Sequence, residues 1–447
     1  MSNPGEADPT PIEHVRDLAG WFAAGSKPRH AWRIGTEHEK FGFRRDDLSP
    51  PPYAPDGIRA VLEGLAAKGW EPILDRGNPI GLRRGGASVS LEPGGQLELS
   101  GGAVADLHAT RAELQSHFAE VREVAAPLGL GFAPLGFHPL ARRDEMPWMP
   151  KARYAIMRAW MPQVGSLGLD MMLRTCTVQV NLDFGDEADM RQKFRTSLAL
   201  QPVATALFAN SPFLEGRPSG FLSLRARAWT DTDAARSGIP ACAFEDGFGF
   251  ERFAEFVLDV PMYFVMRDGG FVDATGATFR DFLAGRHPKL AGVTPTMGDF
   301  ADHVTTVFTD VRLKRFLEMR GSDAGSPEAL VAESALWVGL LYDDAAQAAA
   351  AALVRNWTAA EVTALRAEVP RSALGATIRG HRVRDVARDM LAIARDGLRA
   401  RGLGEERYLD PLDEIAASGV TQAERWLHRV EAEWGGDPRP LLAAAEV

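Results

Sequence analysis

The most regular alternation of apolar and polar residues in the chain spans residues 172–184. One side of this segment carries Cys176, Val178, Val180, Leu182 and Phe184, and the other side carries Thr175, Thr177, Gln179, Asn181 and Asp183. A period of two is typical of a β-strand with one face against a core. We therefore expect a strand here whose second face lines something polar.

Shorter patterns of the same kind predict further strands at residues 32–43, 89–91, 96–99 and 313–320, and a helix followed by a strand within residues 250–266. Pro-Gly-Gly at residues 93–95 joins two of these strands and indicates a hairpin. Apolar residues at helical spacing predict helices at residues 11–24, 56–68, 104–126, 151–161 and 187–208.

The last third of the chain has a helical pattern almost throughout. Helices are predicted at residues 328–341, 345–356, 359–368, 383–401 and 421–434, and no repeat or linker separates them from the rest. We expect an α+β fold in one domain, with an antiparallel-sheet core at about residues 30–325 and a helical layer at about 327–447. At about 150 residues per domain, roughly three units would also fit the length.

The composition is that of an ordinary soluble globular protein. Of 447 residues, 45% are hydrophobic and 25% are charged, which excludes the disordered and fibrous classes. The net charge is −10, so little would drive counterion release from a polyanion, and we expect no nucleic-acid partner. A single nucleotide is not excluded, because a few arginines and a bound metal can hold one inside an acidic protein.

The cysteines and the start of the chain predict a cytoplasmic location. Cys176 and Cys242 are the only cysteines, which excludes a disulfide scaffold and a thiolate-rich metal site. Residues 1–11 are polar and unlike a signal peptide. No apolar run approaches the roughly 20 residues of a membrane span, so we expect no membrane partner either.

Several common catalytic motifs are missing from the sequence. No Gly-Lys dipeptide occurs, which excludes a Walker A loop, and there is no GxSxG, HExxH or CxxC motif. An enzyme with this sequence would therefore run its chemistry on carboxylates, arginines and amides.

Two pairs of glutamates lie on predicted strands. Glu37 and Glu39 are two residues apart, which places them on one face about 6–7 Å from each other. Glu92 and Glu98 flank the predicted hairpin turn. Neighbouring carboxylates on a protected face repel each other, and a bound Mg²⁺ or Mn²⁺ ion commonly neutralises their charge. The alternatives are a solvated edge strand for the first pair and an ordinary exposed hairpin for the second.

Amides and arginines on other predicted strands extend this polar face. Gln179 and Asn181 can ligate a metal or bind a ligand. Arg225 and Arg227 are two residues apart just before Trp229, so on a strand they would share one face. Arginines on such a face can hold carboxylate or phosphate. The alternative is a pair of surface arginines. Glu318 and Arg320 share a face at a strand end, where a simple ion pair is the default. Together these residues would suit a concave site for about two or three Mg²⁺ ions and a nucleotide.

The sequence resembles the plant-type glutamate–cysteine ligases, which also occur in bacteria. The resemblance spans about residues 32–434 and lies in specific motifs: residues 33–43 (RIGTEHEKFGF), 90–101, 174–184 (RTCTVQVNLDF), 229–233 (WTDTD), 244–250 (FEDGFGF), 259–264 (DVPMYF) and 311–321. It implies a glutamine-synthetase-like catalytic fold, in which a curved antiparallel sheet forms the active site.

The implied reaction consumes ATP, L-glutamate and L-cysteine and yields γ-glutamylcysteine, ADP and phosphate through γ-glutamyl phosphate. This is the first step of glutathione synthesis. The resemblance implies Mg²⁺ as the metal, with Mn²⁺ as an alternative, and assigns a role to each candidate residue. Metal ligands are Glu37, Glu39, Glu92 and Glu98; nucleotide contacts are Gln179, Asn181, Glu318 and Arg320; substrate contacts are Arg174, Arg225, Arg227 and Trp229; Arg225 and Arg320 also serve catalysis.

The chain departs from the plant pattern at its cysteines. Ala274 stands where that pattern has a cysteine, so we expect no thiol switch of activity or of dimerisation. A monomer and a homodimer both fit the sequence. Two other functions stay open: a ligase of the same fold that joins glutamate to another amine, and a catalytically silent binding protein.

Overall fold

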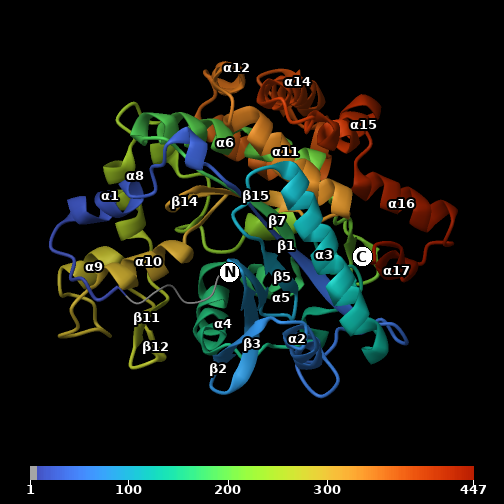
Figure 1. Ribbon diagram of the computed structural model, residues 1–447, viewed down its shortest axis with the longest axis horizontal. Helices are drawn as coiled ribbons and strands as arrows, with labels where there is room; N and C mark the ends of the chain where they lie inside the picture. Colours follow the sequence, from blue (N-terminus) through green and yellow to red (C-terminus); the bar gives the residue numbers. More distant parts are fainter. Residues whose placement is uncertain (1–7) are drawn as a thin grey trace.

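An antiparallel sheet forms the centre of the molecule in the computed structural model, which describes residues 8–447 (Figure 1). Within these residues the sheet has nine strands in the order β14-β15-β7-β1-β5-β4-β3-β2, and β6 also pairs with β1. The strands are β1 (Ile34–Arg44), β2 (Glu71–Asp75), β3 (Asn78–Arg84), β4 (Ala87–Leu91), β5 (Leu97–Ser100), β6 (Leu130–Ala133), β7 (Thr177–Leu182), β14 (Val311–Leu313) and β15 (Leu317–Asp323).

Strand β1 organises the sheet because it has the most partners. Its first half pairs with β7 on one side and β5 on the other, and its second half pairs with β6. It is almost entirely buried. A strand with neighbours on both sides keeps its backbone hydrogen-bonded, so its side chains are held in a fixed register.

Long helices cover the face of the sheet opposite Glu37 and Glu39. His38 on β1 packs against His117 and Phe118 of α3 (Leu107–Ala125), with ring centroids 5.6 and 5.0 Å apart. Thr36 Oγ1 lies 2.7 Å from Ser334 Oγ of α11 (Pro327–Leu341). Helix α6 (Glu187–Leu207) packs against β15. The glutamate face of β1 therefore points away from these helices.

The C-terminal helices are α12 (Asp344–Val354), α13 (Ala359–Ser372), α14 (Val383–Arg401), α15 (Asp410–Ser418), α16 (Gln422–Ala432) and α17 (Pro440–Ala444). Of these helices, α12 to α15 pack on α6 and α11, and α17 packs on β6 (Figure 1). Their boundaries follow local capping chemistry. Thr358 and Glu361 form a capping box at the start of α13, and Gly402 ends α14 in a left-handed conformation.

Shorter elements surround the ends of the sheet. The helices are α1 (Val15–Ala23), α2 (Ile58–Ala66), α4 (Ala152–Val164), α5 (Gly168–Arg174), α7 (Leu224–Trp229), α8 (Phe250–Asp259), α9 (Phe279–Leu283) and α10 (Met297–Thr305). The short strands are β8 (Phe213–Leu214), β9 (Arg217–Pro218), β10 (Ser237–Gly238), β11 (Phe264–Arg267), β12 (Gly270–Asp273), β13 (Phe308–Thr309), β16 (Thr377–Ile378) and β17 (His381–Arg382). None of the helices formed by residues 8–447 combines the length and apolar character needed to cross a membrane.

Three predicted strands are corrected by the structure. Arg225 and Arg227 lie on helix α7, because the Ser223 side chain accepts a hydrogen bond from the Ala226 N–H and caps a helix there. The segment at residues 172–184 is a strand only over β7, since α5 extends to Arg174. The segment at residues 313–320 contains the turn between β14 and β15. Strands β2, β3 and β6 were missed as separate elements.

The backbones of α11 and α14 approach so closely that only glycine fits between them. A Cβ atom at Gly397 would lie 1.9 Å from the Gly339 carbonyl oxygen. We expect Gly397→Ala to lower the free energy of unfolding by about 1–3 kcal/mol, because a backbone must shift to make room. Urea denaturation measures this change.

Gly20 of α1 provides the matched control, since a Cβ there meets nothing within 4 Å. Gly20→Ala should leave stability unchanged or raise it by up to about 1 kcal/mol. Equal stabilities of the two variants would contradict the close contact between α11 and α14.

Candidate active site

The strand register brings the predicted acids and amides onto one face of the sheet. Glu39 on β1 is directly opposite Glu98 on β5, and Glu37 is opposite Gln179 on β7. Asn181 is in turn opposite Glu318 on β15. Directly opposed residues of an antiparallel pair share a face, so residues far apart in sequence converge here.

The carboxylates on this face are buried, and the charged forms of Glu37 and Glu39 are disfavoured there. Glu37 and Glu39 are each 7% exposed, and Glu98 is fully buried. Burial, followed by the charges of Glu92 and Glu98, raises the pKa of Glu39 to about 8. Burial and the neighbouring charges of Glu318 and Glu98 also raise the pKa of Glu37. The protein therefore does not supply enough positive charge to stabilise the ionised forms of Glu37 and Glu39.

Protein donors hold one oxygen of each of these acids. Asn181 Nδ2 donates to Glu37 Oε1 at 2.7 Å, and the Thr177 N–H donates to Glu39 Oε2 at 2.9 Å. Ser90 Oγ donates to Glu98 Oε2 at 2.7 Å. Glu92, also buried, follows the end of β4 at the hairpin turn. Within residues 8–447, no three His, Cys, Asp or Glu side chains already stand where they could hold a metal ion together.

A cationic cluster adjoins the acids on β14 and β15. Glu318 forms ion pairs with Arg312 at 2.6 Å, Lys314 at 3.2 Å and Arg320 at 2.8 Å. Burial alone would raise the pKa of Glu318, but the three cations outweigh it and hold that pKa well below its usual range. Three positive charges share one negative charge, so the cluster can attract a further anion. Arg320 also donates to Gln179 Oε1.

Arg312 and Lys314 were not among the predicted site residues. They precede Glu318 on the β14–β15 hairpin, and register places Arg312 opposite Glu318. The sequence carries two cations two residues apart, Arg312 and Lys314, ahead of the acid Glu318, but this pattern points to the site only once the turn at residues 314–316 is recognised.

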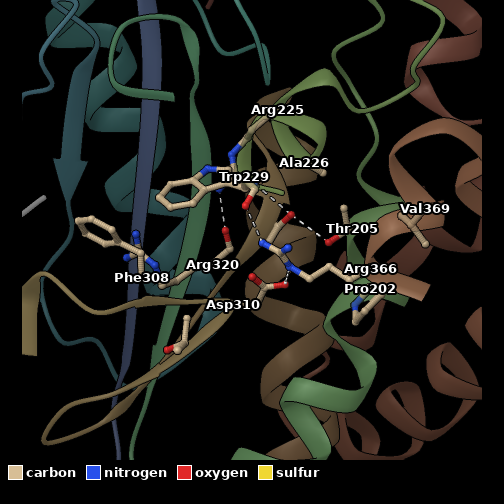
Figure 2. A pocket seen from close by; sticks show the side chains of 12 residues that line it. Pro202, Thr205, Arg225, Ala226, Trp229, Phe308, Asp310, Arg320, Arg366 and Val369 are labelled. Carbon is tan, nitrogen blue, oxygen red and sulfur yellow. Dashed lines mark hydrogen bonds and ion pairs between the residues drawn. The ribbon is translucent and has the colours of Figure 1, made fainter. Parts of the chain in front are cut away.

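A small cavity lies beside Arg320 (Figure 2). Arg225 and Trp229 of α7 line it, together with Phe308, Asp310 and Arg366. It connects two of the predicted substrate residues with the cationic cluster.

Arg225 binds main-chain oxygens at a bulge in β15. The register between β15 and β7 shifts between Met319 and Ser322. Arg225 Nη2 donates to the Arg320 carbonyl at 2.7 Å, and Nη1 donates to the Gly321 carbonyl at 3.1 Å. A bulge leaves ladder groups unpaired and re-aims a side chain. Arg225 therefore satisfies the backbone that positions Arg320.

Arg174 and Arg227 do not line this cavity. Arg174 is buried and forms ion pairs with Asp170 and, at 2.9 Å, with Glu215. Arg227 Nη1 donates to Thr230 Oγ1 at 2.8 Å beside its own helix. Their predicted substrate contacts stay predictions, without support from the geometry.

The two cysteines are free and buried. Burial and the nearby Glu39 charge raise the pKa of Cys176 well above its usual range. Burial raises the pKa of Cys242 to about 11. Ala274, where the plant pattern has a cysteine, is also fully buried.

Comparisons with known proteins match this chain in sequence and in fold. The sequence model of Glutamate-cysteine ligase family 2 (GCS2) covers residues 33–444. Chloroplastic glutamate–cysteine ligases of Brassica juncea and Arabidopsis thaliana are each 52% identical over 427 residues, which is 95% of this chain and 83% and 81% of theirs. A glutamate–cysteine ligase of Francisella tularensis, solved in complex with AMP, matches in fold with a TM-score of 0.57 and 10% identity, over 93% of this chain and 87% of that one.

The chain belongs to the Glutamate-cysteine ligase family 2. This membership confirms the predicted activity, the ATP-dependent joining of the L-glutamate γ-carboxylate to the L-cysteine amine through γ-glutamyl phosphate. The match in fold confirms the predicted glutamine-synthetase-like α+β architecture. The prediction of a cytoplasmic location is wrong, because the plant relatives are chloroplastic enzymes.

Glu333 on α11 lies behind β15 and makes stability depend on pH. Its Oε1 accepts hydrogen bonds from Ser322 Oγ and Trp337 Nε1, each at 2.9 Å, and burial raises its pKa from 4.5 to about 7. Because the folded pKa exceeds the unfolded one, Glu333 contributes stability that is complete below about pH 4.5 and lost as the pH rises through about 7. Glu333→Gln should therefore lose less free energy of unfolding than the wild type between about pH 5 and 8.

The expected difference is on the order of 3 kcal/mol and is measured by urea denaturation across this pH range. Glu328→Gln, at an exposed position of the same helix, should keep the wild-type pH dependence. Identical pH profiles for Glu333→Gln and the wild type would refute the raised pKa.

Proposed function

We propose that the acid face of the sheet binds Mg²⁺, and with it the phosphates of ATP, beside the cavity that receives the amino-acid substrates. The observation that supports this most directly is the shared face of Glu37, Glu39 and Glu98, which continues into the cationic cluster around Glu318. Mg²⁺ needs hard anionic oxygens, and phosphates need cations. The two halves of this face supply both.

The residues on the acid face fit Mg²⁺ by their chemistry. Glu37, Glu39, Glu92 and Glu98 offer carboxylate oxygens, and Asn181 Oδ1 is a buried oxygen without a hydrogen-bond partner in the described part of the chain. The raised pKa values of Glu37 and Glu39 show a shortage of positive charge that a cation would relieve. Mn²⁺ has the same preference for oxygen and is an alternative. Bound there, the metal would neutralise phosphate charge.

The cationic cluster would hold the transferred phosphoryl group. Arg320 is fixed by Glu318 and Gln179, so its guanidinium can stabilise charge without first reorganising. The glutamate γ-carboxylate attacks the γ-phosphorus of ATP and ADP departs; the cysteine amine then attacks the acyl carbon and phosphate departs. Arg225 and Trp229 would line the substrate cavity, with Arg225 acting through the backbone of Arg320 and Gly321.

The whole chain would work as one catalytic unit, either as a monomer or as a homodimer. Helices α6 and α11 join the sheet core at about residues 30–325 to the helical layer at about 327–447. Arg366 of α13 reaches the substrate cavity from that layer. Removing the layer would therefore open the site.

The test of the proposed function is ADP release with Mg-ATP and glutamate across a panel of amines. We expect release that depends on cysteine, on glutamate and on the metal. Release with a different amine only would indicate a ligase with another acceptor, and the absence of release with every amine would refute the function.

Loss of one carboxylate should lower activity without unfolding the protein. Glu39→Gln and Glu92→Gln should each reduce kcat at least about 100-fold and raise the Mg²⁺ concentration needed for half-maximal rate, because a metal-binding oxygen is replaced by a neutral amide. Steady-state assays over a Mg²⁺ series measure both effects.

Glu71→Gln, on the exposed edge strand β2, is the matched control and should behave as wild type. Wild-type kcat with an unchanged Mg²⁺ requirement in Glu39→Gln would remove this residue from the proposed metal site.

A further inference from the structure

Arg366 enters the substrate cavity from α13, outside the sheet (Figure 2). Its Nε donates to Asp310 Oδ2 at 2.7 Å, and its Nη2 donates to the Trp229 carbonyl at 3.0 Å. Both partners also line the cavity. The two bonds fix the plane of the guanidinium, and Nη1 makes no hydrogen bond within residues 8–447. The side chain thus presents unused donors in a fixed orientation.

Arg225 and Arg320 also line the cavity, and one side of its wall is apolar. The rings of Trp229 and Phe308 meet edge to face with centroids 5.7 Å apart, and Val369 and Pro202 complete this side. Trp229 Nε1 is buried without a hydrogen-bond partner in the described residues. The cavity therefore suits a small ligand that has a carboxylate at one end and a compact, weakly polar side chain at the other.

A free cysteine has this shape and charge. Its carboxylate can accept from the guanidinium fork, which binds carboxylates better than any other side chain does. Its thiol behaves as a small hydrophobic group and tolerates aromatic neighbours. A simple amine without a carboxylate would leave the Arg366 donors unused.

We infer that Arg366 binds the α-carboxylate of the amine acceptor, so that the cavity selects an amino acid over a plain amine. This inference rests on the proposed function, which places the acyl phosphate beside Arg320. Asp310 and the Trp229 carbonyl position Arg366, and Arg366 determines acceptor specificity without taking part in proton or phosphoryl transfer.

The test compares L-cysteine with cysteamine, which lacks only the carboxylate, as acceptors for ADP release at saturating glutamate and Mg-ATP. The wild type should prefer cysteine. Arg366→Met should lower kcat/KM for cysteine by about 100-fold, mainly through KM, and change the value for cysteamine by less than about threefold. The KM for glutamate should stay unchanged.

Arg366→Lys keeps the charge but not the fork, and should restore part of the preference for cysteine. Arg371→Met is the matched control on the same helix, because Arg371 contacts the Gly220 carbonyl and the Phe221 ring outside the cavity; it should retain the full preference. Thermal unfolding of each variant shows whether the fold is intact. If Arg366→Met is unfolded, the preference of Arg366→Lys for cysteine over cysteamine tests the inference instead.

Equal losses with cysteine and cysteamine would show that Arg366 only shapes the cavity and would overturn the inference. An increased KM for glutamate would assign the cavity to the other amino acid and would overturn it as well. Wild-type protein that releases no ADP with any amine would instead refute the proposed function, and the inference with it.

Discussion

The architecture of the site depends on the electrostatic cost of burying carboxylates next to one another. Glu39 and Glu98 face each other across two paired strands, an arrangement that is unfavourable for like charges. The Thr177 N–H donates a hydrogen bond to Glu39, and Ser90 Oγ donates one to Glu98. The sheet also concentrates cations around Glu318, one strand beyond Asn181. One face of the sheet thus has a half that carries carboxylates and a half that carries cations. The metal–nucleotide complex proposed for this site is divided in the same way, with a cation beside anionic phosphates.

The cationic half is assembled from elements outside the central strands. Arg312 comes from the β14–β15 hairpin, Arg225 from α7 and Arg366 from α13. Arg225 and Arg366 both donate to main-chain carbonyls, so the backbone of neighbouring elements fixes them. Charges held in this way need not reorganise when substrate charge develops. In the proposed site, the helices around the sheet would therefore contribute to the electrostatics of the reaction as well as to packing.

The acid half could be predicted from the sequence because side-chain parity along a strand is a local property. The period of two alone placed Glu37 and Glu39 on one face of their strand, and Gln179 and Asn181 on one face of theirs. The arginines were harder, since their positions depend on caps and on long-range packing. Residues 224–229, predicted as a strand, form helix α7 because Ser223 caps it. Arg174 forms a buried ion pair with Asp170, four residues earlier. Nothing in residues 359–368 distinguished Arg366 from other surface arginines of an amphipathic helix.

The burial of both cysteines has a consequence for an enzyme that handles a free thiol. Thiol–disulfide exchange needs an accessible thiolate, and its rate follows the thiolate fraction. Cys176 and Cys242 are buried, and their pKa values are shifted upward. Substrate cysteine, or its oxidised dimer, therefore meets no protein thiolate with which to form a mixed disulfide. The fold keeps the catalyst chemically inert toward the most reactive group of its own substrate.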